Sequence, residues 1–308
     1  MFRVEKWCWQ IDWDQFVDRS PMGTIFHKIG FLSYHGNKFS DASMVVFDGS
    51  RPVAVFPAAV AGGSVCSHPG STVGGVVFHR RLSPEDLGEV VDALVCNYRD
   101  AGYESVLIRG TPGAMCRERV MTDFFTLGKH GFNVSRLDLW SVITGDSKMS
   151  SAKKRGVKNA RKSGLEFTEI GVDEFYRLLS DVLRHRHGIE PHHTPEEIAM
   201  LVRMFPGDFN LVGVMSDGVL VAASMVVFLN DVAAHAHYIA SSADGNRLHA
   251  CDLLIHECCN MVFGSGRKVL TLGSVTYYGD FASDGLFRFK TGFGAGIDMH
   301  PFYEVGLI

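Results

Sequence analysis

Four histidines gather in a short stretch of the chain, and their imidazoles are suited to moving protons near neutral pH. They are His185, His187, His192 and His193, with Glu190 among them. Neighbours two apart on a helix point in different directions, and no cysteine or further carboxylate completes a zinc ligand set. We therefore expect no metal. His193 is the first candidate for a catalytic base, followed by Glu190 and His192, and a structural histidine is the alternative.

A lysine near the end of the chain is a second candidate for chemistry. Lys290 lies within Gly285–Gly294, between two phenylalanines and a Gly-Phe-Gly turn. A lysine in such a place can stabilise a developing oxyanion or bind a phosphate. Phe287 and Phe289 are consistent with core positions of a short helix.

A polar segment after a predicted strand in the second half of the chain could hold a phosphate-bearing ligand. The strand ends at 238–240, residues 241–245 form the loop, and a helix follows. Backbone N–H groups at a helix start can bind phosphate, although an ordinary strand–helix connection is the alternative. The candidate cofactor-binding residues are Tyr238, Ile239, Ala240, Asn246, Arg247 and His249.

The equivalent position in the first half is rich in glycine and hydroxyl groups. Residues 67–75 read Ser-His-Pro-Gly-Ser-Thr-Val-Gly-Gly between two apolar segments. Glycines allow a ligand to approach the backbone, and Ser67, His68 and Ser71 can donate hydrogen bonds to it. We expect these three to face the substrate, and a plain turn is the alternative.

A basic cluster between residues 153 and 162 offers a phosphate site. Lys158 shares a helix face with Arg161, and both are candidates to contact substrate phosphate. The alternative is a solvated surface face. Ser274 and Tyr277 complete the set of candidate substrate-binding residues.

The elements that must position these residues occur twice, about 165 residues apart. Three landmarks repeat in the same order: an Asp-Gly hairpin turn, a buried strand ending in glycine, and a helix closed by Gly-Phe. Their positions are 48–49 and 217–218, 106–110 and 269–273, and 131–132 and 292–293. The repeat predicts two copies of one α/β unit, with domains at 1–148 and 149–308.

Each copy is predicted to mix strands and helices. In the first we expect a helix over 20–37 with Ser20 as its N-cap, a hairpin of 44–47 and 52–60, and a helix capped by Ser83. A strand over 106–108 and a helix over 118–130 follow. In the second we expect a strand at 165–170, then two helices, the second capped by Thr194, and three antiparallel strands within 210–240. The remaining predicted elements are a helix at 248–263, a strand at 268–272 and a helix at 284–291.

Composition narrows the class of protein. The 308 residues carry a formal net charge of −4, so there is no global basic field for a long nucleic acid, and a tRNA partner is disfavoured. Seven cysteines without C-x-x-C spacing indicate reduced core thiols. The longest apolar run is too short for a membrane helix, and the N-terminus lacks a signal-peptide pattern. We expect a cytoplasmic protein that does not bind membranes.

The chain resembles a known superfamily. The element order over 210–272, with its loop before Leu248, resembles a GNAT acyltransferase domain, and the first half is similar to a degenerate second copy. The basic helix before Gly164-Leu165, the Ser67–Ser71 segment and the Phe-Lys-x-Gly-Phe-Gly of 289–294 resemble the Fem-type superfamily. The resemblance implies an α/β (mixed α+β) fold of two tandem GNAT-like domains, each a mostly antiparallel mixed sheet flanked by helices. The N-terminal domain would bind the acceptor and the C-terminal domain the acyl donor.

The resemblance also implies an activity. The superfamily contains aminoacyl-tRNA-dependent peptidoglycan-bridge ligases and acyl-CoA-dependent relatives that N-acylate nucleotide-linked amino sugars for surface polysaccharides. The acidic chain lacks a heptad-rich helical arm, which favours acyl-CoA and a nucleotide-diphosphate amino sugar. The usual Gln/Arg-x-x-Gly-x-Gly/Ala signature is reduced to Arg247-Leu248-His249-Ala250. The alternatives are a tRNA-dependent aminoacyl transferase and a non-catalytic binding protein.

Overall fold

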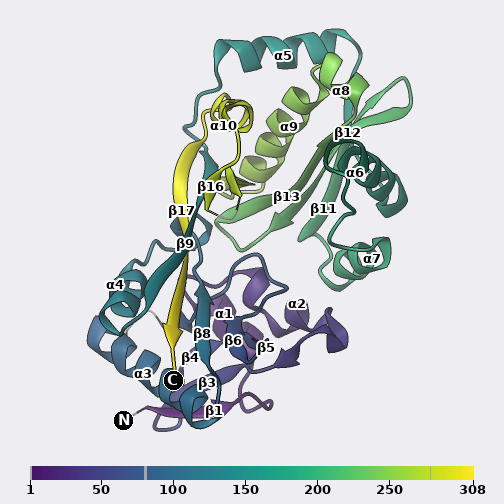
Figure 1. The fold of residues 1–308 in the computed structure, drawn as a ribbon. Helices are drawn as coiled ribbons and strands as arrows, with labels where there is room; N and C mark the ends of the chain where they lie inside the picture. The colour runs from purple at the N-terminus through teal and green to yellow at the C-terminus, as the bar shows by residue number, and fades with distance from the viewer. Residues whose placement is uncertain (1, 80–81, 278) are drawn as a thin grey trace. The chain divides into compact units, whose positions relative to one another are not determined.

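A computed structural model describes residues 2–79, 82–277 and 279–308, which form two compact units (Figure 1). The first unit holds the chain up to Leu139 together with Thr276–Asp280 and Asp298–Ile308. The second holds Trp140–Val275 and Phe281–Ile297. Within the described ranges, no helix is long and apolar enough to cross a membrane.

The first unit contains two sheets and the helices that cover them. One sheet has the strand order β1-β3-β4-β7, and the other contains the order β17-β8-β6-β5-β2. The strands are β1 (Arg3–Lys6), β2 (Ser40–Asp41), β3 (Met44–Asp48), β4 (Arg51–Phe56), β5 (Ala58–Ala61), β6 (Ser64–Ser67), β7 (Val77–Phe78), β8 (Ser105–Arg109) and parts of β9 (Asn133–Thr144) and β17 (Gly296–Gly306). The helices are α1 (Trp13–Arg19), α2 (Ile29–Ser33), α3 (Pro84–Asp100) and α4 (Thr122–Lys129).

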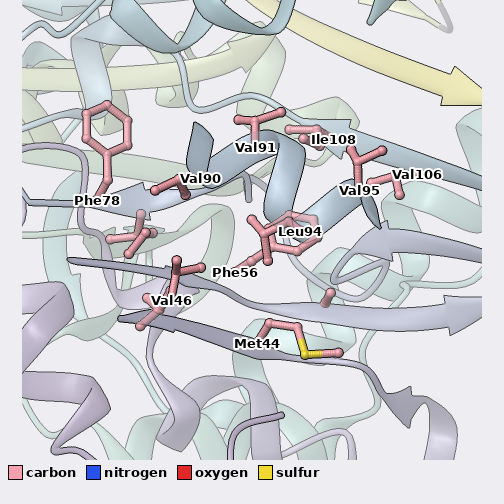
Figure 2. Packing of buried hydrophobic residues seen from close by; sticks show 14 of the residues in the cluster. Met44, Val46, Phe56, Phe78, Val90, Val91, Leu94, Val95, Val106 and Ile108 are labelled. Atoms are coloured by element: carbon pink, nitrogen blue, oxygen red, sulfur yellow. The ribbon is translucent and has the colours of Figure 1, made fainter. Parts of the chain in front are cut away.

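Helix α3 forms the core of the first unit because its apolar residues recur at helical spacing. Val90, Leu94 and their neighbours pack against apolar side chains of β3, β4, β7 and β8 (Figure 2). Ser83 caps the helix as expected: its Oγ accepts the backbone N–H of Asp86 at 3.0 Å. Burying such a face supplies most of the stability of a helix in a protein.

The second unit is one mixed sheet with helices packed on it. Its strand order is β10-β11-β12-β13-β14-β9, and the predicted antiparallel strands β11, β12 and β13 are confirmed. The strands are β10 (Glu166–Glu169), β11 (Phe209–Ser216), β12 (Val219–Phe228), β13 (Ala233–Ser241) and β14 (Val269–Ser274). The helices are α5 (Ser151–Lys162), α6 (Val172–His187), α7 (Pro195–Met204), α8 (Ala243–Arg247), α9 (Ala250–Gly264) and α10 (Asp284–Thr291), and short β15 (Thr276–Tyr277) pairs with β16 (Asp280–Phe281).

The internal repeat is visible in the strand pairing. Each unit contains a single described parallel pair, β6 with β8 and β13 with β14, and a long helix connects the two strands of each pair. Every other strand pair with a described register is antiparallel. The expected fold class, a mostly antiparallel mixed sheet flanked by helices in each half, is confirmed.

The last strand of each copy leaves the unit in which it begins. Residues 140–144 of β9 pair with β14, and residues 302–306 of β17 pair with β8. The compact units are therefore interleaved in sequence. The division at residues 148 and 149 stays a prediction about the two copies.

Two local predictions were wrong. Residues 20–37 do not form one helix: Ser20 ends α1, and its Oγ donates to the carbonyl of Phe78 at 2.7 Å. Short helical turns follow at 25–27, 29–33 and 36–38. The segment 241–245 is not a simple loop either, because Ser242 Oγ accepts the N–H of Gly245 at 3.0 Å and starts α8. A serine hydroxyl can cap a helix or form a tertiary hydrogen bond: Ser242 does the first and Ser20 the second.

Candidate active site

The end of β13 is the structural centre of the candidate site. Its parallel ladder with β14 consists of three residue pairs and ends at His235 opposite Thr271, while β13 continues to Ser241. On its other side, the register with β12 slips between Ala236 and Tyr238, so His237 is an extra, bulged residue. Bulges redirect side chains and free backbone groups, and they are common next to active sites.

Two histidines of β13, the buried His235 and the half-buried His237, lie side by side. The ring centroids of His235 and His237 are 5.5 Å apart, and the His235 ring stacks on Trp140 at 5.1 Å. Nδ1 of His235 lies 2.8 Å from Oγ1 of Thr271. Burial lowers the pKa of His235 to about 3 and the pKa of His237 well below its usual value, so both imidazoles are neutral at pH 7.

His193 joins this group of rings. Its ring centroid lies 5.4 Å from that of His237, and its Nδ1 lies 2.8 Å from the hydroxyl of Tyr238. Burial raises the pKa of Tyr238 to about 12, and hydrogen bonds from the backbone at His193 and His192 oppose that rise. The hydroxyl therefore keeps its proton at neutral pH and donates a hydrogen bond to Nδ1 of His193 in the tautomer that leaves this nitrogen without a proton.

The other two candidate bases lie apart from this contact. Glu190 is exposed and pairs with Arg184, its Oε1 2.5 Å from Nε, and the Ser180 hydroxyl donates to it at 3.2 Å. These hydrogen bonds hold the pKa of Glu190 below its usual value. His192 is exposed. The structure thus brings His193 alone of the three to the buried rings.

Lys290 is a buried cation at the same site. Only 6% of its surface is exposed, and its Nζ donates to the carbonyl of Ser274 at 2.7 Å. Burial lowers the pKa of Lys290 to about 8, and its charge contributes to the low pKa of His235. Helix α10 holds it in place, capped by Ser283, whose Oγ accepts the N–H of Leu286 at 3.1 Å.

The predicted cofactor-binding residues divide into two groups. Ala240 is buried and Ile239 packs against the core of the second unit. Asn246, Arg247 and His249 are exposed, and Arg247 pairs with Asp244. His249 caps α9 with a left-handed backbone, φ 60°.

A groove of about 840 Å³ runs beside the segment 241–246. Helix α6, the turn between β11 and β12, and residues 241–246 line it. Arg186 donates to the carbonyl of Ser241 at 3.1 Å and ties α6 to this segment. Arg177, also on the lining, makes no ion pair with any residue that the structure describes. The groove has the size of a small-molecule site.

Two basic side chains of helix α5, Lys153 and Arg161, form ion pairs with helix α9. Nζ of Lys153 lies 2.6 Å from Asp252 Oδ1 and 4.1 Å from the centre of the Phe289 ring. Arg161 pairs with Glu257 at 2.6 Å, whereas Lys158 is exposed. Of the two candidate phosphate ligands, Lys158 is the one that has no ion-pair partner among the residues that the structure describes.

The glycine-rich segment 67–75 lies in the first unit, and the hydroxyls of Ser67 and Ser71 form hydrogen bonds within that unit. Ser67 Oγ accepts the N–H of Arg109 at 2.6 Å, and Ser71 Oγ donates to the carbonyl of Phe26 at 3.1 Å. His68 stacks on His35 with 5.1 Å between the ring centroids. The side chain of Tyr277 lies outside the described part of the structure. Within the described residues there is no group of three or more His, Cys, Asp or Glu side chains that could hold a metal ion.

Sequence reasoning missed three residues of the site: Trp140, His235 and His237. The signal available was the His-Ala-His pattern on a predicted strand, since residues two apart on a strand share a face. The four histidines within 185–193 form a denser cluster in the sequence. Trp140 had no local signal, because its contact with His235 exists only in the folded sheet.

Comparisons with known proteins agree with this geometry. Residues 147–290 match the family described as Acetyltransferase (GNAT) domain. A comparison with curated protein sequences found no match.

Solved structures similar to this chain have low sequence identity but cover nearly all of it. FemX aligns with a TM-score of 0.73 at 11% identity, over 98% of this chain and 96% of that one. A tandem GNAT protein from the clavulanic acid biosynthesis pathway aligns with a TM-score of 0.59 at 12% identity, over 100% and 99%. The C-terminal DUF2156 domain of a protein named as a lysylphosphatidylglycerol synthetase, from Agrobacterium fabrum, aligns with a TM-score of 0.64 at 13% identity, over 95% and 89%. The chain therefore has the fold of these solved structures, and its residues 147–290 match the Acetyltransferase (GNAT) domain family.

Proposed function

We propose that this protein is an N-acyltransferase that moves an acyl group from acyl-CoA to the amine of a nucleotide-diphosphate amino sugar. One observation carries the proposal: the contacting rings that run from His193 through His237 to His235, the last of them beside Lys290. This run brings a proton acceptor and a buried cation to the point where β13 leaves β14. Acyl transfer to an amine needs both groups.

His193 and Tyr238 would remove the proton from the amine. An ammonium group has no lone pair, so the acceptor must lose a proton before its nitrogen attacks the thioester carbonyl. Tyr238 donates to Nδ1 of His193, and the pair can pass one proton from the amine through the hydroxyl to the imidazole. The backbone hydrogen bonds at His192 and His193 stabilise the charge that develops on the tyrosine oxygen.

Lys290 would stabilise the oxyanion that forms as the amine attacks. With a pKa of about 8 it is mostly protonated at pH 7, and in a buried site its charge acts with little screening. When the tetrahedral intermediate collapses, the carbon–sulfur bond breaks and the thiolate of CoA leaves. The neutral histidines beside Lys290 add no competing charge.

The groove beside 241–246 supports acyl-CoA as the donor. Its volume of about 840 Å³ suits a large ligand, and the guanidinium groups of Arg177 and Arg186 on α6 can bind phosphates, beside the carboxylates of Glu174, Asp181 and Asp244 on the same lining. Asn246 lies on the lining, whereas Arg247 and His249 do not. We assign the donor to this groove and to the free edge of β13.

The amino-sugar acceptor rests on the resemblance of the sequence. Lys158 is our candidate for its phosphate because the side chain is exposed and has no ion-pair partner among the residues that the structure describes. A second function deserves a test because FemX aligns over 98% of this chain. The Fem-type resemblance implies aminoacyl transfer from tRNA for that alternative.

Donor binding separates these functions. Calorimetric titration with acetyl-CoA and a longer acyl-CoA should show micromolar binding of at least one, and release of free CoA thiol should then require an amine acceptor such as a nucleotide-diphosphate amino sugar. Binding without turnover on any amino sugar would contradict the acceptor. Retention of aminoacyl-tRNA at low salt, with no binding of either acyl-CoA, would favour the alternative.

A further inference from the structure

A second pocket lies in the first unit and belongs to no part of the proposed reaction. It has a volume of about 290 Å³ and lies between α1 and the start of β4. Its lining consists of Ile11, Asp12, Gln15, Phe16, Arg19, Ser20, Arg51, Pro52 and His79. This volume admits a small organic anion and excludes a nucleotide sugar.

Two guanidinium groups give the pocket its charge. Arg19 lies in the last turn of α1, and it makes no hydrogen bond or ion pair through its side chain with any residue that the structure describes. Arg51 begins β4, and its Nη2 lies 3.3 Å from Nε2 of His79. Neither arginine has a carboxylate partner among the described residues, although surface arginines commonly find one.

The single carboxylate on the pocket lining, that of Asp12, caps helix α1. Oδ1 of Asp12 accepts the N–H of Gln15 at 2.9 Å and so caps α1. An aspartate at this position stabilises the helix by about 1 kcal/mol, and that role holds its carboxylate at the helix N-terminus. The pocket therefore keeps a net positive charge from Arg19 and Arg51.

The remaining lining is apolar. Ile11, Phe16 and Pro52 are half-buried and form a hydrophobic wall. Ser20 at the back is buried, and its hydroxyl donates to the carbonyl of Phe78. Such a site recognises an anion through its rim and an apolar body through its wall.

We infer that this pocket binds a small phosphate monoester, with Arg19 and Arg51 contacting the phosphate and Phe16 contacting the organic group. The two arginines outweigh the single carboxylate of Asp12, and guanidinium groups bind phosphate oxygens in a bidentate manner. This inference is independent of the proposed acyl transfer, because none of the lining residues has a role in that reaction.

Phenyl phosphate is the probe that tests it, measured by calorimetry on the full chain without acyl-CoA. We expect phenyl phosphate to bind more tightly than inorganic phosphate, binding to weaken as salt rises, and phenol to show none. Arg51→Gln and Arg19→Gln should each weaken binding by about tenfold, and the double variant should abolish it. Both side chains are exposed, so the thermal melts of the variants should match that of the wild type.

Arg203→Gln is the matched control, since it removes one exposed arginine charge from α7, which does not line the pocket. Equal loss of binding in Arg203→Gln and Arg51→Gln would show that only net charge matters and would overturn the inference. Benzoate that binds as well as phenyl phosphate would overturn the assignment to phosphate. No binding of phenyl phosphate at millimolar concentration would also refute the site.

Discussion

The hydroxyl of Tyr238 lies 2.8 Å from Nδ1 of His193, although the two residues are 45 positions apart in sequence. One comes from the bulged strand β13 and the other from the segment between α6 and α7. If the hydroxyl donates to Nδ1, this ring nitrogen is the one that accepts the proton in the proposed mechanism. This is the relationship through which the proposed mechanism is most directly tested.

His193→Ala should reduce kcat by roughly 10²-fold or more because the relay loses its proton acceptor. Tyr238→Phe should give a similar loss with little change in the KM for acyl-CoA, since it removes the hydroxyl alone. Steady-state kinetics with an amine acceptor measures both. His192→Ala is the control for His193, and its activity should stay near that of the wild type because this side chain is exposed. Full activity in His193→Ala would remove the residue from the mechanism.

Lys290→Met should separate activity from stability. Transition-state stabilisation is lost, so we expect kcat to fall by about 10²-fold or more. Burial lowers the pKa of Lys290 from its usual 10.5 to about 8, so the buried charge destabilises the fold below pH 8 by roughly 3 kcal/mol. Methionine removes that penalty and should raise Tm at pH 7.

The pH dependence of this effect has a definite sign. Between pH 8 and 10.5 the unfolded chain holds a proton on Lys290 that the folded chain has lost, so the wild type gains stability as pH rises. The advantage of Lys290→Met should therefore shrink toward pH 10. Melting both proteins from pH 7 to pH 10 checks this, and a constant difference in Tm would contradict the buried-lysine interpretation.

Asp123→Asn should alter the acid response of the first unit. Oδ1 of Asp123 is buried without a hydrogen-bond partner among the described residues, and burial raises the pKa of Asp123 from 3.8 to about 6. The folded state holds a proton that the unfolded state has lost between these values, so stability falls as pH rises through this window. The variant should lose that dependence and be more stable than the wild type at pH 7, by up to about 3 kcal/mol. Urea titrations at pH 4 and pH 7 would measure it.

Lys153→Met should destabilise the second unit by about 3 kcal/mol, because it removes the lysine that pairs with the nearly buried carboxylate of Asp252 and leaves that carboxylate with His249, whose Nδ1 lies 3.4 Å from Oδ2. The methionine keeps the contact with Phe289, so the loss reports the charge. Lys154→Met, its exposed neighbour, should change stability by less than about 0.5 kcal/mol. Urea unfolding of the two variants compares them. Equal stability would mean that Asp252 is solvated in the native protein.

Arg177→Gln should weaken acyl-CoA binding by about tenfold if the groove beside 241–246 holds the phosphates of the donor. Calorimetry with acetyl-CoA measures this, and Arg203→Gln is the charge-matched control. Unchanged affinity in Arg177→Gln would move the donor out of the groove without touching the roles of His193 and Lys290.

The amino-acid sequence by itself determined the elements whose signals are local. The turns at Asp48-Gly49 and Asp217-Gly218 were predicted because these residues tolerate positive φ, which is 58° at Gly49 and 78° at Gly218. The caps at Ser83 and Thr194 were predicted because each hydroxyl reaches an N–H three residues later. The repeat of these signals predicted two copies of one α/β unit and placed Lys290 near the end of the second copy, whereas its burial was not predicted.

Only the tertiary structure decided which side chains meet. Ser20 could have begun a helix, but its hydroxyl bonds to Phe78, 58 residues away. The sequence does not distinguish Lys153 from an exposed lysine. In the folded protein its neighbours are Asp252 of α9 and Phe289 of α10. Likewise, Trp140, His235 and His193 come from separate elements, and no periodicity reports their contacts. The physical reason is that caps and turns depend on bonds within a few residues, whereas burial and pKa depend on neighbours that the folded sheet alone brings together.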